Sequence, residues 1–238
     1  GNTQLTANPN ERNIFLAKLN QDGLWQWAVK IDLNLKENSF SDFVVDSTGN
    51  SYLLGEFENS LTIGSTTLNS AGEKDIFFAK ISNTGSIIWA NDAGGMKNDY
   101  ASGMEIDANG NLFILGEIDD YNDSPSVAGM NVSCSNGNCD FMFLAKLNNA
   151  GMAISVETVD HVRPWDLSSD GMGNLYIAGR VACCGSSVSF GSIVIDGPIN
   201  NTVPEVAVIA KINSAGNWVW ATSFGSTDEV IDNSWNDR

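Results

Sequence analysis

An acidic run with one aromatic residue, Asp119-Asp120-Tyr121-Asn122-Asp123, is the densest group of potential ligands in the chain. Carboxylate and amide oxygens are the ligands that calcium prefers in proteins. The run lacks the D-x-D-x-D-G spacing of a recognisable calcium loop, so we predict no cofactor and keep calcium as the alternative. It lies in the longest segment between predicted strands. We therefore expect Asp119, Asp120, Tyr121 and Asp123 to belong to a ligand-binding loop.

The single histidine, His161, stands four residues before Trp165. A Ser–His–Asp or Cys–His catalytic site would have to use this histidine, but the chain has no nucleophile motif such as G-x-S-x-G. We predict no catalytic residue and assign His161 and Trp165 to a binding surface, where the indole can stack on a sugar ring. Carboxylate pairs for glycoside cleavage remain open, because 29 Asp and Glu residues offer many pairs.

The four cysteines fall into two pairs. Cys134 and Cys139 enclose four polar residues that include Asn-Gly, which predicts a disulfide across a hairpin. Cys183 and Cys184 are adjacent and form either a vicinal disulfide or two free thiols. The spacing is not C-x-x-C and there is one histidine, so we predict no metal site. An even cysteine count with Asn-, Ser- and Gly-rich turns favours an oxidising compartment.

Charge and hydropathy limit the partners of the protein. The 238 residues carry 12 Lys and Arg against 29 Asp and Glu, for a net charge of −17. Such a surface repels phosphate backbones and anionic lipid, so we expect no nucleic acid as a partner. No run approaches the roughly 18 apolar residues that span a bilayer, and we expect no direct membrane insertion. The first residue is Gly1 and no signal segment is evident, so we expect a processed or excised piece.

The element that must position these residues is a strand that occurs four times. Phe77-Phe78-Ala79-Lys80-Ile81 is followed by a turn at Asn83-Thr84-Gly85 and a strand containing Trp89-Ala90. The Ala-Lys pair recurs as Ala17-Lys18, Ala145-Lys146 and Ala210-Lys211, at steps of 62, 66 and 65 residues. A tryptophan strand follows in three copies, whereas the third copy reads Ile154-Ser155-Val156. The apolar runs predict burial on both faces, and we expect each lysine to pair with an acid or with turn carbonyls.

A second set of turns marks the same period at another phase. The turns Asp46-Ser47-Thr48-Gly49-Asn50, Asp107-Ala108-Asn109-Gly110-Asn111 and Asp170-Gly171-Met172-Gly173-Asn174 each precede a strand of aromatic and β-branched residues. Asp can cap the turn amides and Gly can take a positive φ, so each turn predicts a β-hairpin with a structural aspartate. Two hairpins per period make four strands, which is the blade of a β-propeller.

The predicted fold is therefore all-β, a single β-propeller region over residues 1–238 built from four-stranded antiparallel blades. We place a partial blade at 1–41, three complete blades at about 42–98, 99–160 and 161–225, and a partial blade at 226–238. Repeat units expose apolar faces unless neighbours cover them. We therefore expect the chain to be part of a propeller of six to eight blades, the usual range.

The repeat resembles a known bacterial family. The unit Asp-Ile-Phe-x-Ala-Lys, then Gly and Trp-Ala, then Asp-x-x-Gly-Asn-x-Tyr-x-x-Gly, is similar to the SBBP-type β-propeller repeat. Asp75 to Gly116 carries it most fully, and less complete copies cover the rest of the chain. The resemblance implies a bacterial protein that is secreted or held at the cell surface, and it implies no particular activity.

We expect a non-enzymatic extracellular or cell-surface module that binds protein or carbohydrate, or that acts as a scaffold. Its other partners would be the remaining blades of the same parent chain or a larger surface assembly. The alternative is a polysaccharide hydrolase or lyase that uses carboxylates at the mouth of the propeller. Function should be sought in the segments that do not repeat, namely 117–140, His161 to Trp165, and Cys183-Cys184.

Overall fold

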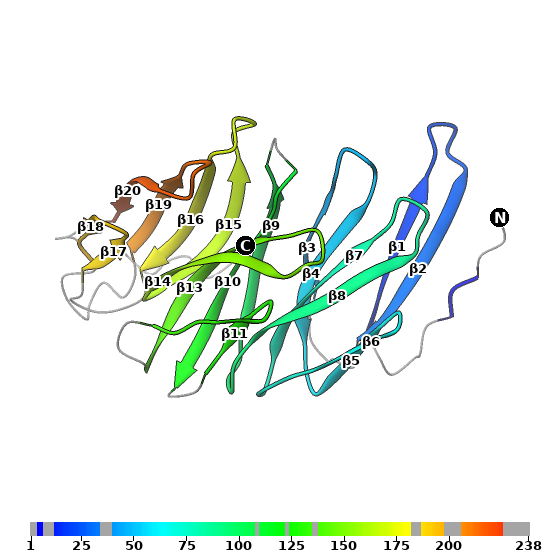
Figure 1. The fold of residues 1–238 in the computed structure, drawn as a ribbon, viewed down its shortest axis with the longest axis horizontal. Coiled ribbons are helices and arrows are strands. Elements are labelled where there is room, and N and C mark those ends of the chain that lie inside the picture. The colour runs from blue at the N-terminus through cyan, green and yellow to red at the C-terminus, as the bar shows by residue number, and fades with distance from the viewer. Residues whose placement is uncertain are drawn as a thin grey trace, which may run out of the picture.

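The chain forms a succession of antiparallel β-sheets in a computed structural model (Figure 1). The structure describes residues 4–6, 12–33, 40–107, 110–121, 124–134, 138–181, 187–197 and 206–225. Within these ranges only the backbone is described for Arg12, Leu33, Asp120, Tyr121, Asn138 and Cys139. Across the described part of the chain, no helix has the length and apolarity needed to cross a bilayer.

Four main sheets follow one another along the sequence. Sheet I is the hairpin of β1 (Arg12–Leu19) and β2 (Trp25–Leu33). Sheet II contains β3 (Phe40–Val45), β4 (Ser51–Phe57), β7 (Asp75–Ile81) and β8 (Ile87–Gly94). Sheet III contains β9 (Tyr100–Ile106), β10 (Leu112–Tyr121), β13 (Asn138–Leu147) and β14 (Ala153–Asp160). Sheet IV contains β15 (Val162–Ser169), β16 (Leu175–Val181), β19 (Val206–Ile212) and β20 (Trp218–Phe224). Within sheets II, III and IV these four strands are neighbours in chain order and antiparallel, so the predicted all-β fold with four antiparallel strands per repeat is confirmed.

The prediction of two hairpins per period is wrong, because a short third hairpin connects the second strand of each sheet to the third. These hairpins are β5 (Ser60–Ile63) with β6 (Thr66–Asn69), β11 (Ser126–Val127) with β12 (Met130–Asn131), and β17 (Val188–Phe190) with β18 (Ile193–Ile195). Each reaches the last strand of the preceding sheet: β5 contacts β2, β11 pairs with β8, and β17 contacts β14. The third hairpin therefore ties consecutive sheets together.

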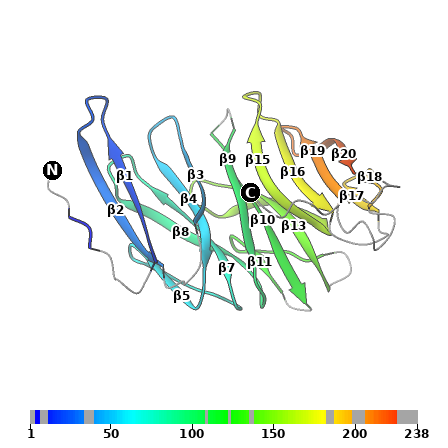
Figure 2. The same ribbon diagram turned by 180° about the vertical axis from the view of Figure 1, so that it is seen from behind.

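The sheets stand side by side in a row, from sheet I at one end to sheet IV at the other (Figures 1 and 2). Their first strands touch in sequence, β3 against β9 and β9 against β15. Three clusters of buried side chains fill the three spaces between neighbouring sheets. The core is thus divided into layers, each shared by two successive sheets.

Strand β7 shows how one sheet serves two layers. Phe77 and Ala79 pack toward sheet I, whereas Ile76 and Phe78 pack toward sheet III, and all four are fully buried. Alternate side chains of a strand point to opposite faces, so a continuous apolar run suits a strand covered on both sides. The predicted double burial of this strand is confirmed.

The predicted capping aspartates are also confirmed. Asp46 accepts hydrogen bonds from the backbone amides of Thr48 and Asn50, each at 2.9 Å, and from the Asn50 side chain at 2.9 Å. Burial raises the pKa of the Asp46 carboxyl, but these bonds together outweigh it and hold the pKa well below its usual range. Asp107 and Asp170 accept equivalent bonds from Asn111 and Asn174. The three carboxylates are therefore turn caps.

The repeated lysines have mixed partners. Lys18 Nζ donates to the Asn83 carbonyl at 3.4 Å, and Lys211 Nζ lies 3.9 Å from a carboxylate oxygen of Asp170. Lys80 instead lies over the ring of Tyr52, 5.0 Å from its centroid, and Lys146 over that of Phe113 at 5.6 Å. The predicted pairing with acids or carbonyls therefore misses a cation–π contact that the aromatic residue on the neighbouring strand provides.

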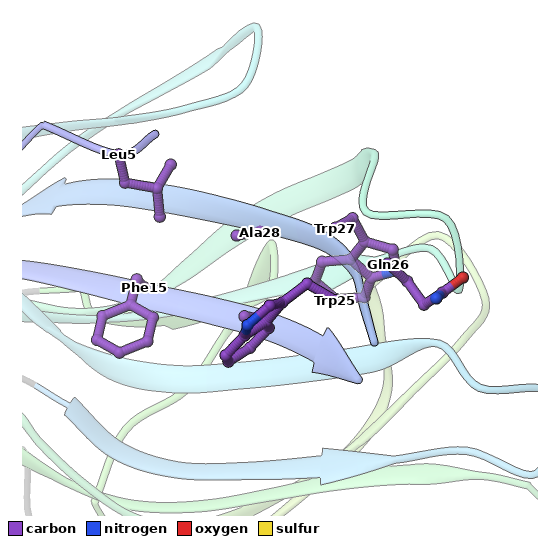
Figure 3. Close-up of a pocket in the computed structure, with 7 residues that line it drawn as sticks. Leu5, Phe15, Trp25, Gln26, Trp27 and Ala28 are labelled. Atoms are coloured by element: carbon purple, nitrogen blue, oxygen red, sulfur yellow. The ribbon is translucent and has the colours of Figure 1, made fainter. Parts of the chain in front are cut away.

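The two ends of the row carry apolar side chains without a covering sheet among the described residues. At sheet I, a hollow of about 360 Å³ is lined by Leu5, Phe15 and Trp25 among others (Figure 3). Phe15 is 69% exposed, although it occupies the same repeat position as the fully buried Phe77. At the other end, Ile209 of β19 is 37% exposed at the position of Phe78. The same residue pattern is buried inside the row and exposed at its ends.

Candidate functional site

The backbone that builds the site is a bulge in the first strand of sheets II, III and IV. Each bulge lies opposite a glycine of the second strand, at Gly55, Gly116 and Gly179. A Cβ on Gly116 would lie 2.8 Å from the carbonyl oxygen of Tyr100, and one on Gly179 would lie 2.6 Å from that of Arg163. Gly116 and Gly179 therefore have to be glycine, because the backbone of the bulged strand lies too close for a Cβ.

Two repeat positions beside these glycines line one cavity of about 570 Å³. The bulged residues Ser41, Ser102 and Trp165 and the residues after the three glycines, Glu56, Glu117 and Arg180, all line it. Sheets II and III thus contribute the same pair of residue types, a serine and a glutamate, whereas sheet IV contributes a tryptophan and an arginine. The lining therefore departs from the repeat at sheet IV.

Acids and guanidinium groups dominate the lining. Four carboxylates, those of Glu56, Glu117, Asp119 and Asp140, face two arginines, Arg163 and Arg180. Arg163 Nε lies 3.0 Å from Glu117 Oε1, and its Nη2 donates to Asp140 Oδ2 at 2.8 Å. Glu56 pairs with Lys74 outside the lining, at 2.9 Å. One arginine therefore joins two carboxylates from different strands of sheet III.

Burial and like charge shift the titration of two of these acids. Burial is the largest influence on Glu117 and raises its pKa to about 7, against the attraction of Arg163. Asp119 lies directly opposite Asp140 across the β10–β13 pair. Burial, then a hydrogen bond and the charge of Asp140, raise the pKa of Asp119 to about 6. At neutral pH Glu117 is therefore partly protonated, whereas Asp119 keeps its proton only in mildly acidic solution.

Aromatic rings stand at the edge of the cavity. Trp165 is 55% exposed at the bulge of β15 and Tyr100 is 43% exposed at the start of β9. One face of the Tyr100 ring is covered by Lys74, whose Nζ lies 4.0 Å from the centroid. Trp165 is therefore the ring in the lining with the larger free surface.

The structure brings together Asp119 and Trp165 among the predicted site residues. His161 occupies the tight turn between β14 and β15 with a φ of 61°, where its amide donates to the carbonyl of Asp140 at 2.8 Å. It is not among the described residues that line the cavity. The histidine thus holds the turn beside the site.

The predicted loop over 119–121 is wrong, because Asp119, Asp120 and Tyr121 continue strand β10. They pair with Asp140, Cys139 and Asn138, so that β10 and β13 are each ten residues long. The side chains of Asp120 and Tyr121 and all of Asp123 lie outside the described residues. Within the described part of the chain, no group of three acidic, histidine or cysteine side chains is arranged to hold a metal ion.

The cysteine predictions are tested only at Cys134. This residue is buried and takes part in a disulfide bond. The side chain of Cys139 and the whole of Cys183 and Cys184 lie outside the described residues, so the pairing of Cys134 with Cys139 stays a prediction.

Most of the residues that line the cavity were not predicted. Three of them directly follow the last glycine of the repeated Asp-x-x-Gly-Asn-x-Tyr/Phe-x-x-Gly unit, and the next position of the repeat is charged and varies between copies: these are Glu56, Glu117 and Arg180. Asp140 and Arg163 carry no such signal. They meet Glu117 only because β10, β13 and β15 converge at this end of the sheets.

Comparison with known proteins leaves the family open. No protein-family model and no curated protein matches the sequence. A crystal structure of a protein of unknown function from Bacteroides caccae aligns with 90% of this chain and 76% of its own, at 11% identity and a TM-score of 0.28. The resemblance to the SBBP-type repeat therefore stays a prediction.

Proposed function

We propose that the protein is a β-propeller module of a secreted or cell-surface bacterial protein, of the SBBP type, that binds carbohydrate in the charged cavity. The propeller is supported by the order of the four main strands in sheets II, III and IV, by the contacts between their successive first strands, and by the layered core. The exposed apolar residues at both ends of the row support a ring with more blades, six to eight in the usual range. The further blades, or a larger surface assembly, would cover those faces.

The observation that carries the binding proposal is the exposed indole of Trp165 beside carboxylates that accept hydrogen bonds. Sugar hydroxyls donate to carboxylates and accept from guanidinium groups, and the apolar face of a pyranose stacks on an aromatic ring. A cavity of about 570 Å³ with converging polar groups lies within the range of small-molecule sites. The charge also disfavours anionic glycans and favours neutral ones.

The test compares two exposed tryptophans. We expect Trp165→Ala to weaken binding of a neutral polysaccharide by about tenfold, since a stacked aromatic contact contributes about 1–1.5 kcal/mol. Binding is measured by isothermal titration calorimetry after a screen of neutral glycans. Trp25→Ala is the matched control, because Trp25 is 59% exposed in sheet I, outside this cavity. Equal affinities for the two variants, or a screen in which no neutral glycan binds the wild type, would contradict carbohydrate binding at Trp165.

One observation favours a second function, the cleavage of a polysaccharide by hydrolysis or by β-elimination. A carboxyl with a pKa of about 7, such as Glu117, can donate a proton to a leaving oxygen at neutral pH. Asp119 and Asp140 lie in the same cavity as candidates for the second carboxylate. The release of new reducing ends or unsaturated ends from a bound glycan, and its loss in Glu117→Gln, would establish this activity. If the bound glycan stays intact, the protein binds carbohydrate without cleaving it.

A further inference from the structure

One repeat position departs from its sister positions inside the row. The residue opposite the repeated lysine is Trp27 in sheet I, Trp89 in sheet II and Trp220 in sheet IV. In sheet III the residue opposite Lys146 is Ser155. The serine is exposed, and it stands on β14 where sheet III meets sheet IV.

At the two sister sites the indole seals the junction between neighbouring sheets. Trp27 Nε1 donates to the carbonyl oxygen of Asn83 and Trp89 Nε1 to that of Asn149, both at 2.9 Å. In each case the acceptor belongs to the turn between the third and fourth strands of the next sheet. The ring also covers the glycine of that turn, since a Cβ on Gly85 or Gly151 would lie 2.8 Å from the indole.

The third junction has the same turn without the indole. A Cβ on Gly216 would meet no heavy atom within 4 Å, and Gly216 is exposed where Gly151 is buried. The carbonyl oxygen of Ser214 stands at the position of the two indole acceptors. No donor among the described residues bonds it.

A cleft of about 220 Å³ occupies the space that the missing ring leaves. Its apolar lining includes Phe113, Leu144, Leu175 and Ile212, and the turn 213–216 and Ser155 also line it. Phe113 carries Lys146 above its ring, as Tyr52 carries Lys80. Tyr52 also has a tilted tryptophan partner, with Trp89 at 6.1 Å and 56°. Among the described residues, no tryptophan packs against Phe113 in this way.

We propose that this cleft binds a small planar aromatic molecule with a ring N–H, an indole being the reference shape. The ring would lie tilted against Phe113 and donate its N–H to the carbonyl oxygen of Ser214, as Trp89 does at the sister junction. An apolar cavity of roughly 150 Å³ is enough to bind benzene in water, so the cleft has room for one such ring. Glu157, which also lines the cleft, can accept a hydrogen bond from a second donor on the ligand.

The experiment titrates the 238-residue protein with indole and with benzofuran, which has the same shape but no N–H. We expect saturable binding of indole by calorimetry, with amide shifts at Ala215 and Gly216 in the ¹H–¹⁵N spectrum. Benzofuran should bind about tenfold more weakly, because the Ser214 carbonyl then loses its donor. Equal affinities, or indole shifts that spare the 213–216 turn, would overturn the proposal.

Two variants and one further probe complete the test. Ser155→Trp should fill the cleft from within and lower indole affinity by about tenfold or more, while Ser189→Trp, on the exposed face of β17 and outside the cleft, should leave it unchanged. Ser155→Phe serves the same purpose if the tryptophan variant does not fold. Undiminished affinity in a folded Ser155 variant would overturn the proposal. Binding of N-acetyl-tryptophanamide as tight as that of indole would identify a peptide tryptophan as the source of the ring, and binding of indole alone would identify a free metabolite.

Discussion

Replacing Phe77 with alanine is expected to destabilise the folded chain by about 3–5 kcal/mol, the range for removing a buried phenylalanine. Phe77 is fully buried between sheets I and II and makes an edge-to-face contact with Phe57, with ring centroids 6.5 Å apart. Both faces of its strand are covered, so the surrounding layers cannot collapse easily into the space. The free energy of unfolding is measured by urea titration followed by circular dichroism.

Phe15 provides a control with the same side chain as Phe77 but without its burial. It is the same residue type at the same repeat position, but it is 69% exposed on sheet I. Phe15→Ala is therefore expected to change the free energy of unfolding by no more than about 0.5 kcal/mol. A large cost at Phe15 would mean that another surface covers sheet I in solution. Equal small costs at both positions would contradict the layered core.

This pair of phenylalanines shows how far the sequence predicts the fold. The repeat of Phe-x-Ala-Lys predicts the strand, its pairing and its double burial, because a short apolar run bounded by glycine turns has few other stable arrangements. It cannot predict the third hairpin, whose strands have two to four residues and whose glycines, Gly64, Gly129 and Gly191, look like ordinary turns. That hairpin is specified by contacts with the preceding sheet, which lie far away in sequence.

The site was harder to predict than the fold for a related reason. Trp165 and Asp119 are predicted from residue type, but Asp119 is expected in a loop and the bulge that carries Trp165 is not expected. Asp119 lies in a strand because β13 begins early and pairs with it, which the polar run 119–123 gives no reason to expect. Trp165 lies at a bulge, and a bulge depends on the register between two strands. The cavity lining follows from convergence of three sheets, and the period of a repeat carries no information on which ends converge.

The titration of Glu117 leads to the second large effect, a fall in stability as pH rises. Its folded pKa of about 7 lies above the ordinary value of 4.5, so the folded state holds a proton that the unfolded state releases. The associated stability is fully present below pH 4.5 and is lost as pH rises through about 7. At 1.36 kcal/mol for each pKa unit, the loss is about 2–3 kcal/mol after allowance for partial exposure to solvent.

Asp119 acts in the same direction, over a slightly lower range. Its pKa is raised from 3.8 to about 6, so its share of the stability is lost between about pH 4 and pH 6. The capping carboxylate Asp46 acts oppositely, because its pKa is lowered and its stability is lost only as pH falls below about 4. The free energy of unfolding should therefore be greatest near pH 4–5 and decline toward pH 8.

Glu117→Gln isolates the largest part of this decline. The amide keeps the size of the side chain and cannot ionise, so the variant should lose about 2–3 kcal/mol less than the wild type between pH 4.5 and pH 8. Urea unfolding at pH 4.5, 6 and 8 gives the two profiles, and Ser189→Ala, an exposed change without a titrating group, should reproduce the wild-type slope. A carbon-detected NMR titration locates the Glu117 carboxyl independently. If that carboxyl titrates near 4.5, or if the profiles of the variant and the wild type are parallel, Glu117 is ionised at neutral pH. The cavity would then hold a network of fixed charges around Arg163, and Glu117 would have no proton to donate to a bound sugar.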